Sequence, residues 1–143
     1  MEVEWLIVAD AAEVVNNKLY MMGGGWDAFF VNDGWPASRR VAVAASFKVP
    51  WNQTNQRHRL DIDILDHDGN ELGQLGGHFE VGQPLGVPSG HAQRVQLSAD
   101  LELTFQGPGE VVIVARVEGQ ELRRTSIQVV LGPVLQMRQR AAG

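Results

Sequence analysis

The chain has 143 residues, of which 44% are hydrophobic and 20% charged, and its formal net charge is −5. This length is typical of a single domain, and the apolar content excludes a largely disordered chain. The absence of cysteine excludes disulfide scaffolds, thiol nucleophiles and cysteine-ligated metal centres, while the scattered basic residues and mild negative charge argue against nucleic-acid binding.

The start of the chain combines two acidic side chains, Glu2 and Glu4, with a short apolar run. A signal peptide needs a basic start and a longer apolar segment, so we expect a cytoplasmic protein. No apolar run in the sequence approaches the roughly 18 residues that a membrane helix requires, so we expect no membrane association.

The first predicted elements are short strands separated by turns. Asn16-Asn17 lies between the apolar pairs Val14-Val15 and Leu19-Tyr20, and asparagine tolerates the left-handed conformation of tight turns. Gly23-Gly24-Gly25 lacks the lysine and helix of a phosphate-binding loop, so we interpret it as a bulged or closely approached strand. Asn32-Asp33-Gly34 predicts the next turn.

The middle of the chain has apolar residues at every second position, the pattern of strands with one buried face. It predicts strands at 40–49 and 59–65. A hairpin turn follows at His67-Asp68-Gly69-Asn70, because Asp-Gly favours the positive φ of such turns. Two longer loops are expected, an amide-rich loop at 51–56 and a proline-rich loop at 82–93.

The second half contains the longest alternation, at 94–105, followed by strands at 111–117 and 122–131. Gly132-Pro133 ends the last strand and leaves 134–143 as a tail, either frayed or docked on a neighbouring subunit. About eight strands and no helix predict an all-β fold over residues 1–133, a two-sheet antiparallel β-sandwich of immunoglobulin-like or related Greek-key type. A closed β-barrel is the alternative.

Five segments carry a recognisable pattern: Ala9 to Tyr20, Gly23 to Asp27, Val49-Pro50-Trp51-Asn52, Asp66 to Glu71, and Phe79 to Gly82. Together they resemble a family of small uncharacterised bacterial β-sandwich proteins, and the similarity covers most of the chain. The resemblance implies a single-domain cytoplasmic β-sandwich and no catalytic residue. Asn17 stands where that family leads us to expect glycine, and both residues accept a left-handed turn.

Few side chains are arranged for catalysis or metal binding. Asp66 to Glu71 alternates oxygen ligands, but its glycine is misplaced for an EF-hand, so we interpret it as a hairpin turn. No two of the four histidines have metal-ligand spacing, so a metal site would require His67 and His91 to converge from separate loops. Asp61 and Asp63 share one strand face and are interpreted as solvated. We expect no catalytic residue, no metal and no cofactor.

The most informative feature is a surplus of apolar residues at positions that face solvent in the predicted fold. Residues 5–9 and 111–115 are apolar throughout, and Ala42 and Ala44 lie at outward positions. One small core cannot accommodate all of the chain's large aromatic residues, so we predict that five of them mediate contacts: Trp26, Phe29, Phe30, Trp35 and Trp51. Contiguous apolar surface is typical of protein interfaces, and the glycines at 73–77 suit close backbone contact.

We therefore predict a non-enzymatic interaction or structural module that forms a homo-oligomer or binds a protein partner through apolar sheet faces or edges. The alternative is a small-molecule binding protein or enzyme, with carbohydrate as the candidate ligand. Its site would lie among the loops at 32–37, 51–56 and 82–93. Trp35 and Trp51 would be stacking surfaces, and polar contacts would come from Asn52, Gln53, Asn55 and His91.

Overall fold

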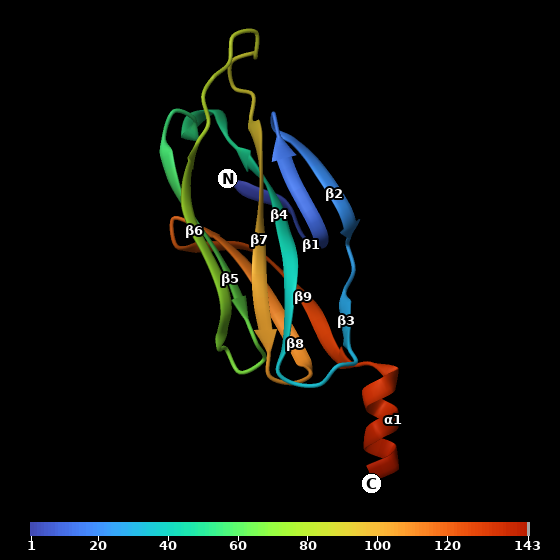
Figure 1. Cartoon of the computed structure of the whole chain (residues 1–143). Coiled ribbons are helices and arrows are strands. Elements are labelled where there is room, and N and C mark those ends of the chain that lie inside the picture. The colour runs from blue at the N-terminus through green and yellow to red at the C-terminus, as the bar shows by residue number, and fades with distance from the viewer. Residues whose placement is uncertain (143) are drawn as a thin grey trace.

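The computed structural model describes residues 1–142, which form nine strands, a short 3₁₀ helix and a C-terminal α-helix (Figure 1). In chain order the elements are β1 (Glu2–Val15), β2 (Lys18–Gly24), β3 (Ala28–Val31), β4 (Ala37–Val49), the 3₁₀ helix (Trp51–Gln53), β5 (Arg57–Leu65), β6 (Glu71–Glu80), β7 (Gln93–Phe105), β8 (Gly109–Val117), β9 (Gln120–Leu131) and α1 (Pro133–Ala142). The all-β class is therefore confirmed.

The strands form two separate sheets. The four-stranded sheet has the order β2-β1-β4-β7, and the five-stranded sheet has the order β3-β9-β8-β5-β6. All pairs are antiparallel except β3 and β9, which are parallel, so the expectation of a wholly antiparallel fold was wrong at this edge. Among the described residues β6 and β7 are not paired to each other, so the strands do not close into one barrel.

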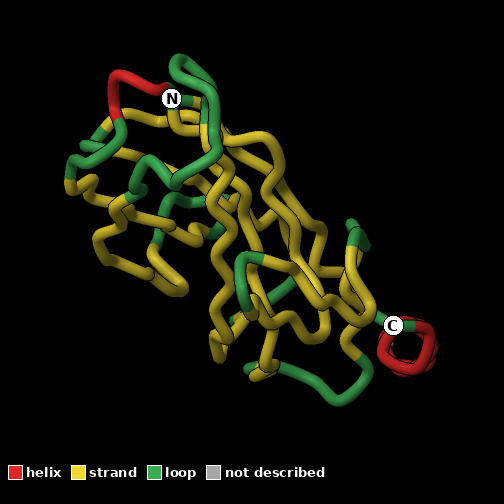
Figure 2. Tube along the Cα trace, turned by 90° about the horizontal axis from the view of Figure 1, so that it is seen from above, coloured by secondary structure: helices red, strands yellow, loops and turns green. Residues whose placement is uncertain are grey.

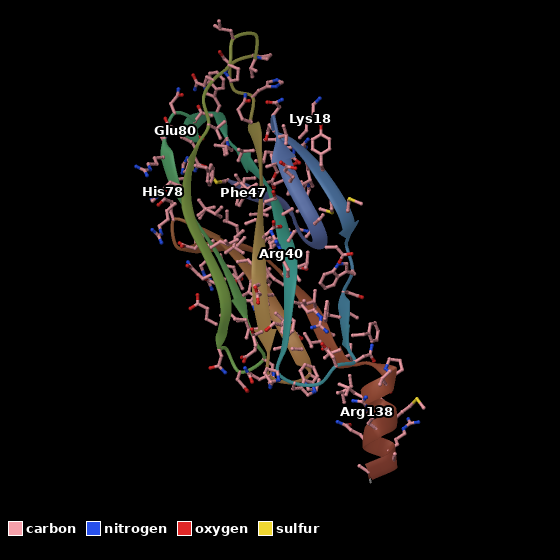
Figure 3. The ribbon with its side chains drawn as sticks, viewed as in Figure 1. Lys18, Arg40, Phe47, His78, Glu80 and Arg138 are labelled. Carbon is pink, nitrogen blue, oxygen red and sulfur yellow. The ribbon has the colours of Figure 1, made fainter. Side chains whose placement is uncertain are left out.

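One apolar core lies between the two sheets, built from the alternate inward residues that the sequence pattern predicts. Phe47 and Leu103 come from the four-stranded sheet and Ile64 and Ile113 from the five-stranded sheet, and each is at most 1% exposed. Figure 3 shows Phe47 on β4 between the sheets, where its ring lies 5.3 Å from that of Phe79 on β6. Burial of these side chains supplies most of the driving force for folding.

β1 reverses direction near its middle. Its first residues pair with the end of β4, where Glu2 lies opposite Lys48, and Lys48 in turn lies opposite Arg94 of β7. The turn after β1 returns to the same place, because Asn17 is hydrogen-bonded to Arg94. Residues 11–24, the second half of β1 with β2, are called the β1–β2 hairpin below, and this hairpin folds back over the outer side of the four-stranded sheet (Figure 1).

The β1–β2 hairpin explains much of the apolar surplus in the sequence. Ala42, Ala44 and Ser46 lie on the outer side of β4, yet all three are fully buried. Both β1 and β2 contact β7 although neither is paired with it. Small side chains at 42, 44 and 46 allow the hairpin to approach the sheet closely, so this apolar face is covered within the monomer.

The outer side of the five-stranded sheet is charged. Asp61 accepts hydrogen bonds from Arg59 at 3.0 Å and from Gln74 at 3.1 Å, and Asp63 pairs with Arg116. Beneath these groups Val114 is only 1% exposed, because the long side chains of the ion pairs cover it. The apolar run 111–115 therefore does not form an exposed apolar face, and the two aspartates are bound in ion pairs.

The C-terminal segment, for which no helix was predicted, is the α-helix α1. Pro133 occupies the start of the helix, where its missing N–H is not needed, and the following residues favour helix. Leu135 packs against the core, whereas Val134 is 46% and Met137 69% exposed. In Figures 1 and 2 α1 stands apart from the two sheets. Residue 143 of the predicted tail lies outside the described residues.

Neither of the two helical segments in residues 1–142 has the length and apolar character needed to cross a membrane.

Candidate functional site: the open edge between β6 and β7

The outermost strands of the two sheets, β6 and β7, lie next to each other (Figure 1), and in the described structure they are not hydrogen-bonded to each other. They are consecutive in the chain and are joined by the loop 81–92. An apolar pocket of about 250 Å³ lies between them. Its lining comes from both sheets: Val43, Leu60, Ile62, Leu75, Gly76, Gly77, His78, Leu97, Ser98 and Ala99.

The pocket exists because two inward positions carry little or no side chain. Gly77 lies opposite the inward residue Leu60, and a Cβ placed on Gly77 would have no heavy atom within 4 Å. On the facing strand, Ala99 lies opposite Val43 and contributes only a methyl group. Leu97 and Ala99 remain half-exposed although their positions face inward. A larger residue at 77 or 99 would fill this space.

The hydrogen bonds of Asn17, in the β1–β2 hairpin, show which backbone groups of β7 point away from β4. Asn17 Oδ1 accepts a hydrogen bond from the Gln96 N–H at 3.0 Å, and Asn17 Nδ2 donates to the Arg94 carbonyl at 2.9 Å. Because strand backbone groups alternate in direction, the same edge carries the N–H and C=O groups of Ser98, Asp100 and the alternate residues that follow. Asn17 therefore covers only the first part of this edge.

The rim of the opening is more acidic than basic. On β7, Asp100 and Glu102 point to the outer side, and Asp100 forms an exposed ion pair with Arg40 at 2.9 Å. On β6, His78 and Glu80 are exposed along the strand (Figure 3). Arg94, the one basic residue of β7, is already held by Glu4.

Glu4 links β1 to β7 on the outer side of the four-stranded sheet. Its carboxylate accepts two hydrogen bonds from Arg94, at 2.7 and 2.9 Å, and one from the Ser46 hydroxyl at 3.0 Å. The Arg94 hydrogen bonds lower the pKa of Glu4 from 4.5 to about 2, with smaller contributions from Ser46 and nearby positive charge. The carboxylate is thus ionised over the whole physiological range and anchors β1 to the edge strand.

Two of the aromatic residues predicted to mediate contacts lie in an intramolecular cluster. Trp26 is half-buried against Phe29 at a ring separation of 5.8 Å, and Phe29 lies 6.0 Å from Phe105 and beneath the Arg39 guanidinium. The Trp26 Nε1 is buried without a hydrogen-bond partner in the described structure. Phe30, on the other side of β3, is 59% exposed. Of these three residues, Phe30 offers the free surface.

The residues of the predicted ligand site do not form one site. Trp35 precedes β4 and Trp51 follows it, so the length of the strand, about 40 Å, separates them. Trp35 packs half-buried against the core, while Trp51 lines a depression of about 440 Å³ with Gly90 and Ala92 of the proline-rich loop. Asn52, Asn55 and His91 are exposed and are not part of its lining.

The two histidines considered for a metal site lie at opposite ends of the fold. His67 is in the β5–β6 turn and His91 is in the loop before β7, so the length of β6 lies between them. Asp66 organises its turn by accepting the backbone N–H groups of Asp68 and Asn70, and the bond from Asn70 is the main cause of its lowered pKa. Within residues 1–142 no group of three or more candidate ligands is arranged to hold a metal ion.

Sequence reasoning identified the glycine-rich segment of β6 but missed the residues that face it. Ala99 interrupts the run of larger apolar residues in β7, and this small residue was the available signal. Asn17 was interpreted only as a turn residue, although its side chain also binds the edge of β7. Two exposed apolar residues of the β1–β2 hairpin were also missed, Tyr20 at 58% and Met22 at 75% exposure.

Two sheets around one core, with the unpaired edges of β6 and β7 beside an apolar pocket, define a small all-β protein. The chain belongs to a family of unknown function, DUF6941, whose model matches residues 4–130. This confirms the expectation of an uncharacterised domain family.

Comparison with solved structures found a likeness to the Pseudomonas fluorescens alkylpurine DNA glycosylase AlkC bound to DNA containing an abasic site analogue. The identity is 12% and the TM-score 0.39, over 87% of this chain and 30% of that one. The chain thus spans less than a third of that protein, and a likeness at this level supports no functional argument. The comparison with curated proteins gave no match.

Proposed function

We propose that this protein is a non-enzymatic interaction module that binds another polypeptide along the open edge between β6 and β7. The observation that carries the proposal is the pair of unpaired strand edges beside an apolar pocket. Natural sheets rarely leave a long edge free, because unpaired N–H and C=O groups recruit further strands. A free edge beside a pocket is the arrangement in which an added strand gains both backbone hydrogen bonds and buried side chains.

The strand order supports an immunoglobulin-like β-sandwich as the scaffold of this module. The order β1-β4-β7 corresponds to strands A, B and E of that fold, and β9-β8-β5-β6 corresponds to G, F, C and C′. In this correspondence the open side lies between strands E and C′.

We also propose a cytoplasmic location, which cell fractionation tests.

We also propose that the protein self-associates. The exposed side chains of Tyr20, Met22 and Phe30 support it, because aromatic residues and methionine are enriched in protein interfaces. Replacement of Phe30 by Asp changes an exposed position, so the fold should persist while any oligomer that uses this surface dissociates.

Native mass spectrometry on gently purified protein, combined with hydrogen exchange, tests the proposal. We expect a complex with a second polypeptide or a second copy, in which the amides of Ser98, Asp100 and Glu102 exchange more slowly than in the isolated chain. A monomer that carries a stoichiometric small molecule would support the ligand-binding alternative instead. A polypeptide complex with unchanged exchange along β6 and β7 would overturn the proposed edge and keep only the interaction role.

A further inference from the structure

The part of the β7 edge that is available for pairing begins at Ser98. Asn17 binds the Arg94 carbonyl and the Gln96 N–H, so an added strand meets the alternate residues from Ser98 to Thr104, called the free stretch below. Proteins commonly block such edges with lysine, proline or a bulge. β7 contains no lysine or proline, and its register with β4 continues without a shift from Gln93 to Phe105. This stretch is therefore a regular edge without the usual protection.

The pocket lies where inward side chains of an added strand would enter. Ala99 and Leu97 are inward neighbours of the free stretch, and the empty position at Gly77 faces them from β6. A strand paired with β7 would direct the inward side chains nearest Leu97 and Ala99 into this apolar space. Medium-sized apolar residues at those positions would be buried against Leu60 and Ile62.

The charge of the free stretch determines which side chains are favoured on the outward face of an added strand. Asp100 and Glu102 point outward there, with Arg40 as their neighbour on β4, and no basic residue lies between Ser98 and Phe105. Directly opposite residues of neighbouring strands attract when their charges differ and repel when they match. Lysine or arginine is therefore favoured at the outward positions of the partner.

The same charges disfavour a second copy of β7. Antiparallel pairing of two copies within residues 98–104 brings Asp100 and Glu102 of both chains together. A register that places Arg94 opposite either acid brings the second strand to the Arg94 carbonyl, which Asn17 already binds. The free stretch is thus better suited to a partner of different sequence.

We propose that the β6–β7 opening binds an extended peptide segment in which basic residues alternate with apolar ones, paired to the free stretch of β7. The inference rests on the proposed function and names its partner by chemistry. The basic residues lie beside Asp100 and Glu102, and the apolar residue opposite Ala99 enters the pocket at Gly77.

The test uses two labelled synthetic peptides, acetyl-Lys-Val-Lys-Leu-Lys-Val-Lys-amide and its counterpart with glutamate in place of lysine, titrated with the full chain and followed by fluorescence anisotropy. We expect the basic peptide to bind at least about ten-fold more tightly. The double substitution Asp100→Lys and Glu102→Lys should reverse that preference. Equal binding of both peptides, or no saturation by about 1 mM, overturns the inference.

Three variants locate the bound peptide. Ser98→Pro removes an N–H that points away from β4, so it should abolish binding without breaking the ladder. Gly77→Val fills the pocket and should weaken binding. Gln74→Val, on the same strand β6, is the matched control. Urea unfolding shows which variants remain folded.

The outcomes separate this inference from the proposed function. If Ser98→Pro and Gly77→Val are folded and bind the basic peptide as before, the site is elsewhere and the inference fails. If neither peptide binds but a polypeptide complex protects the β7 amides, the basic partner is wrong and the edge-binding role stands. If no complex forms and no peptide binds, both fail.

Discussion

Asn17 replaces a neighbouring strand at the start of the β7 edge, since its Oδ1 accepts the Gln96 N–H at 3.0 Å although 79 residues separate the two. Its Nδ2 donates to the Arg94 carbonyl at 2.9 Å, and its own carbonyl accepts from the Gln96 amide side chain at 2.6 Å. Asn16 and Asn17 both have positive φ, 52° and 57°. The asparagine at 17 thus satisfies the turn and also fixes the hairpin to the edge strand.

Asn17→Gly should separate these two roles, because glycine keeps the left-handed turn and loses the side-chain bonds. We expect the free energy of unfolding to fall by about 1 kcal/mol and the Gln96 amide to exchange faster. Urea denaturation and hydrogen exchange measure both effects. Asn16→Gly is the matched control and should leave both values nearly unchanged; an equal loss in the two variants would show that the turn, not the edge contact, is responsible.

Gly77→Ala should stabilise the protein. The new methyl group enters open space in the pocket, and the unfolded chain loses conformational freedom, so the free energy of unfolding should rise by about 1 kcal/mol. Gly73→Ala is the comparison on the same strand, because its Cβ would lie 3.0 Å from Leu103 Cδ2, on a side chain that is 1% exposed. It should give no gain. Thermal unfolding distinguishes the two, and a loss at 77 would mean that the pocket is not open.

Glu4→Gln should reduce stability in a pH-dependent way. The pKa of Glu4 is lowered to about 2 in the folded chain, so the ionised carboxylate stabilises the fold above its unfolded pKa of 4.5. That contribution is lost as pH falls from 4.5 towards 2, so the difference in Tm between variant and unaltered protein should be largest near neutral pH and shrink across this window. Glu2→Gln removes the same charge from the same strand and serves as control. A constant difference at all pH values would contradict the assignment.

Removal of residues 134–143 should leave the two sheets folded. The segment contributes the half-buried Leu135 and the hydrogen bond from Gln136 Nε2 to the Leu131 carbonyl at 2.6 Å. We expect a loss of about 1 to 2 kcal/mol and a single cooperative transition. Leu135→Ala should reproduce much of that loss. If the shortened chain fails to unfold cooperatively, the boundary of the folded unit near 133 is wrong.

Local patterns were sufficient for most of the strands. Alternation over 94–105 fixes which side chains of β7 face inward, and the same logic holds for β4 and β5. The C-terminal helix was missed because Gly132-Pro133 was interpreted as a stop signal, although proline also begins helices. The parallel pairing of β3 was missed because a four-residue strand carries too short a pattern to show its partner.

The sequence by itself determined the all-β class, the family resemblance and the inward face of each long strand, because these depend on side-chain alternation along a local stretch of chain. Only the tertiary structure decided which apolar residues are exposed. The β1–β2 hairpin buries Ala42 and Ala44, ion pairs cover Val114, and the opening at Gly77 and Ala99 depends on two strands that meet only in the folded chain. Burial depends on what lies opposite a residue in space, and no local pattern contains that information.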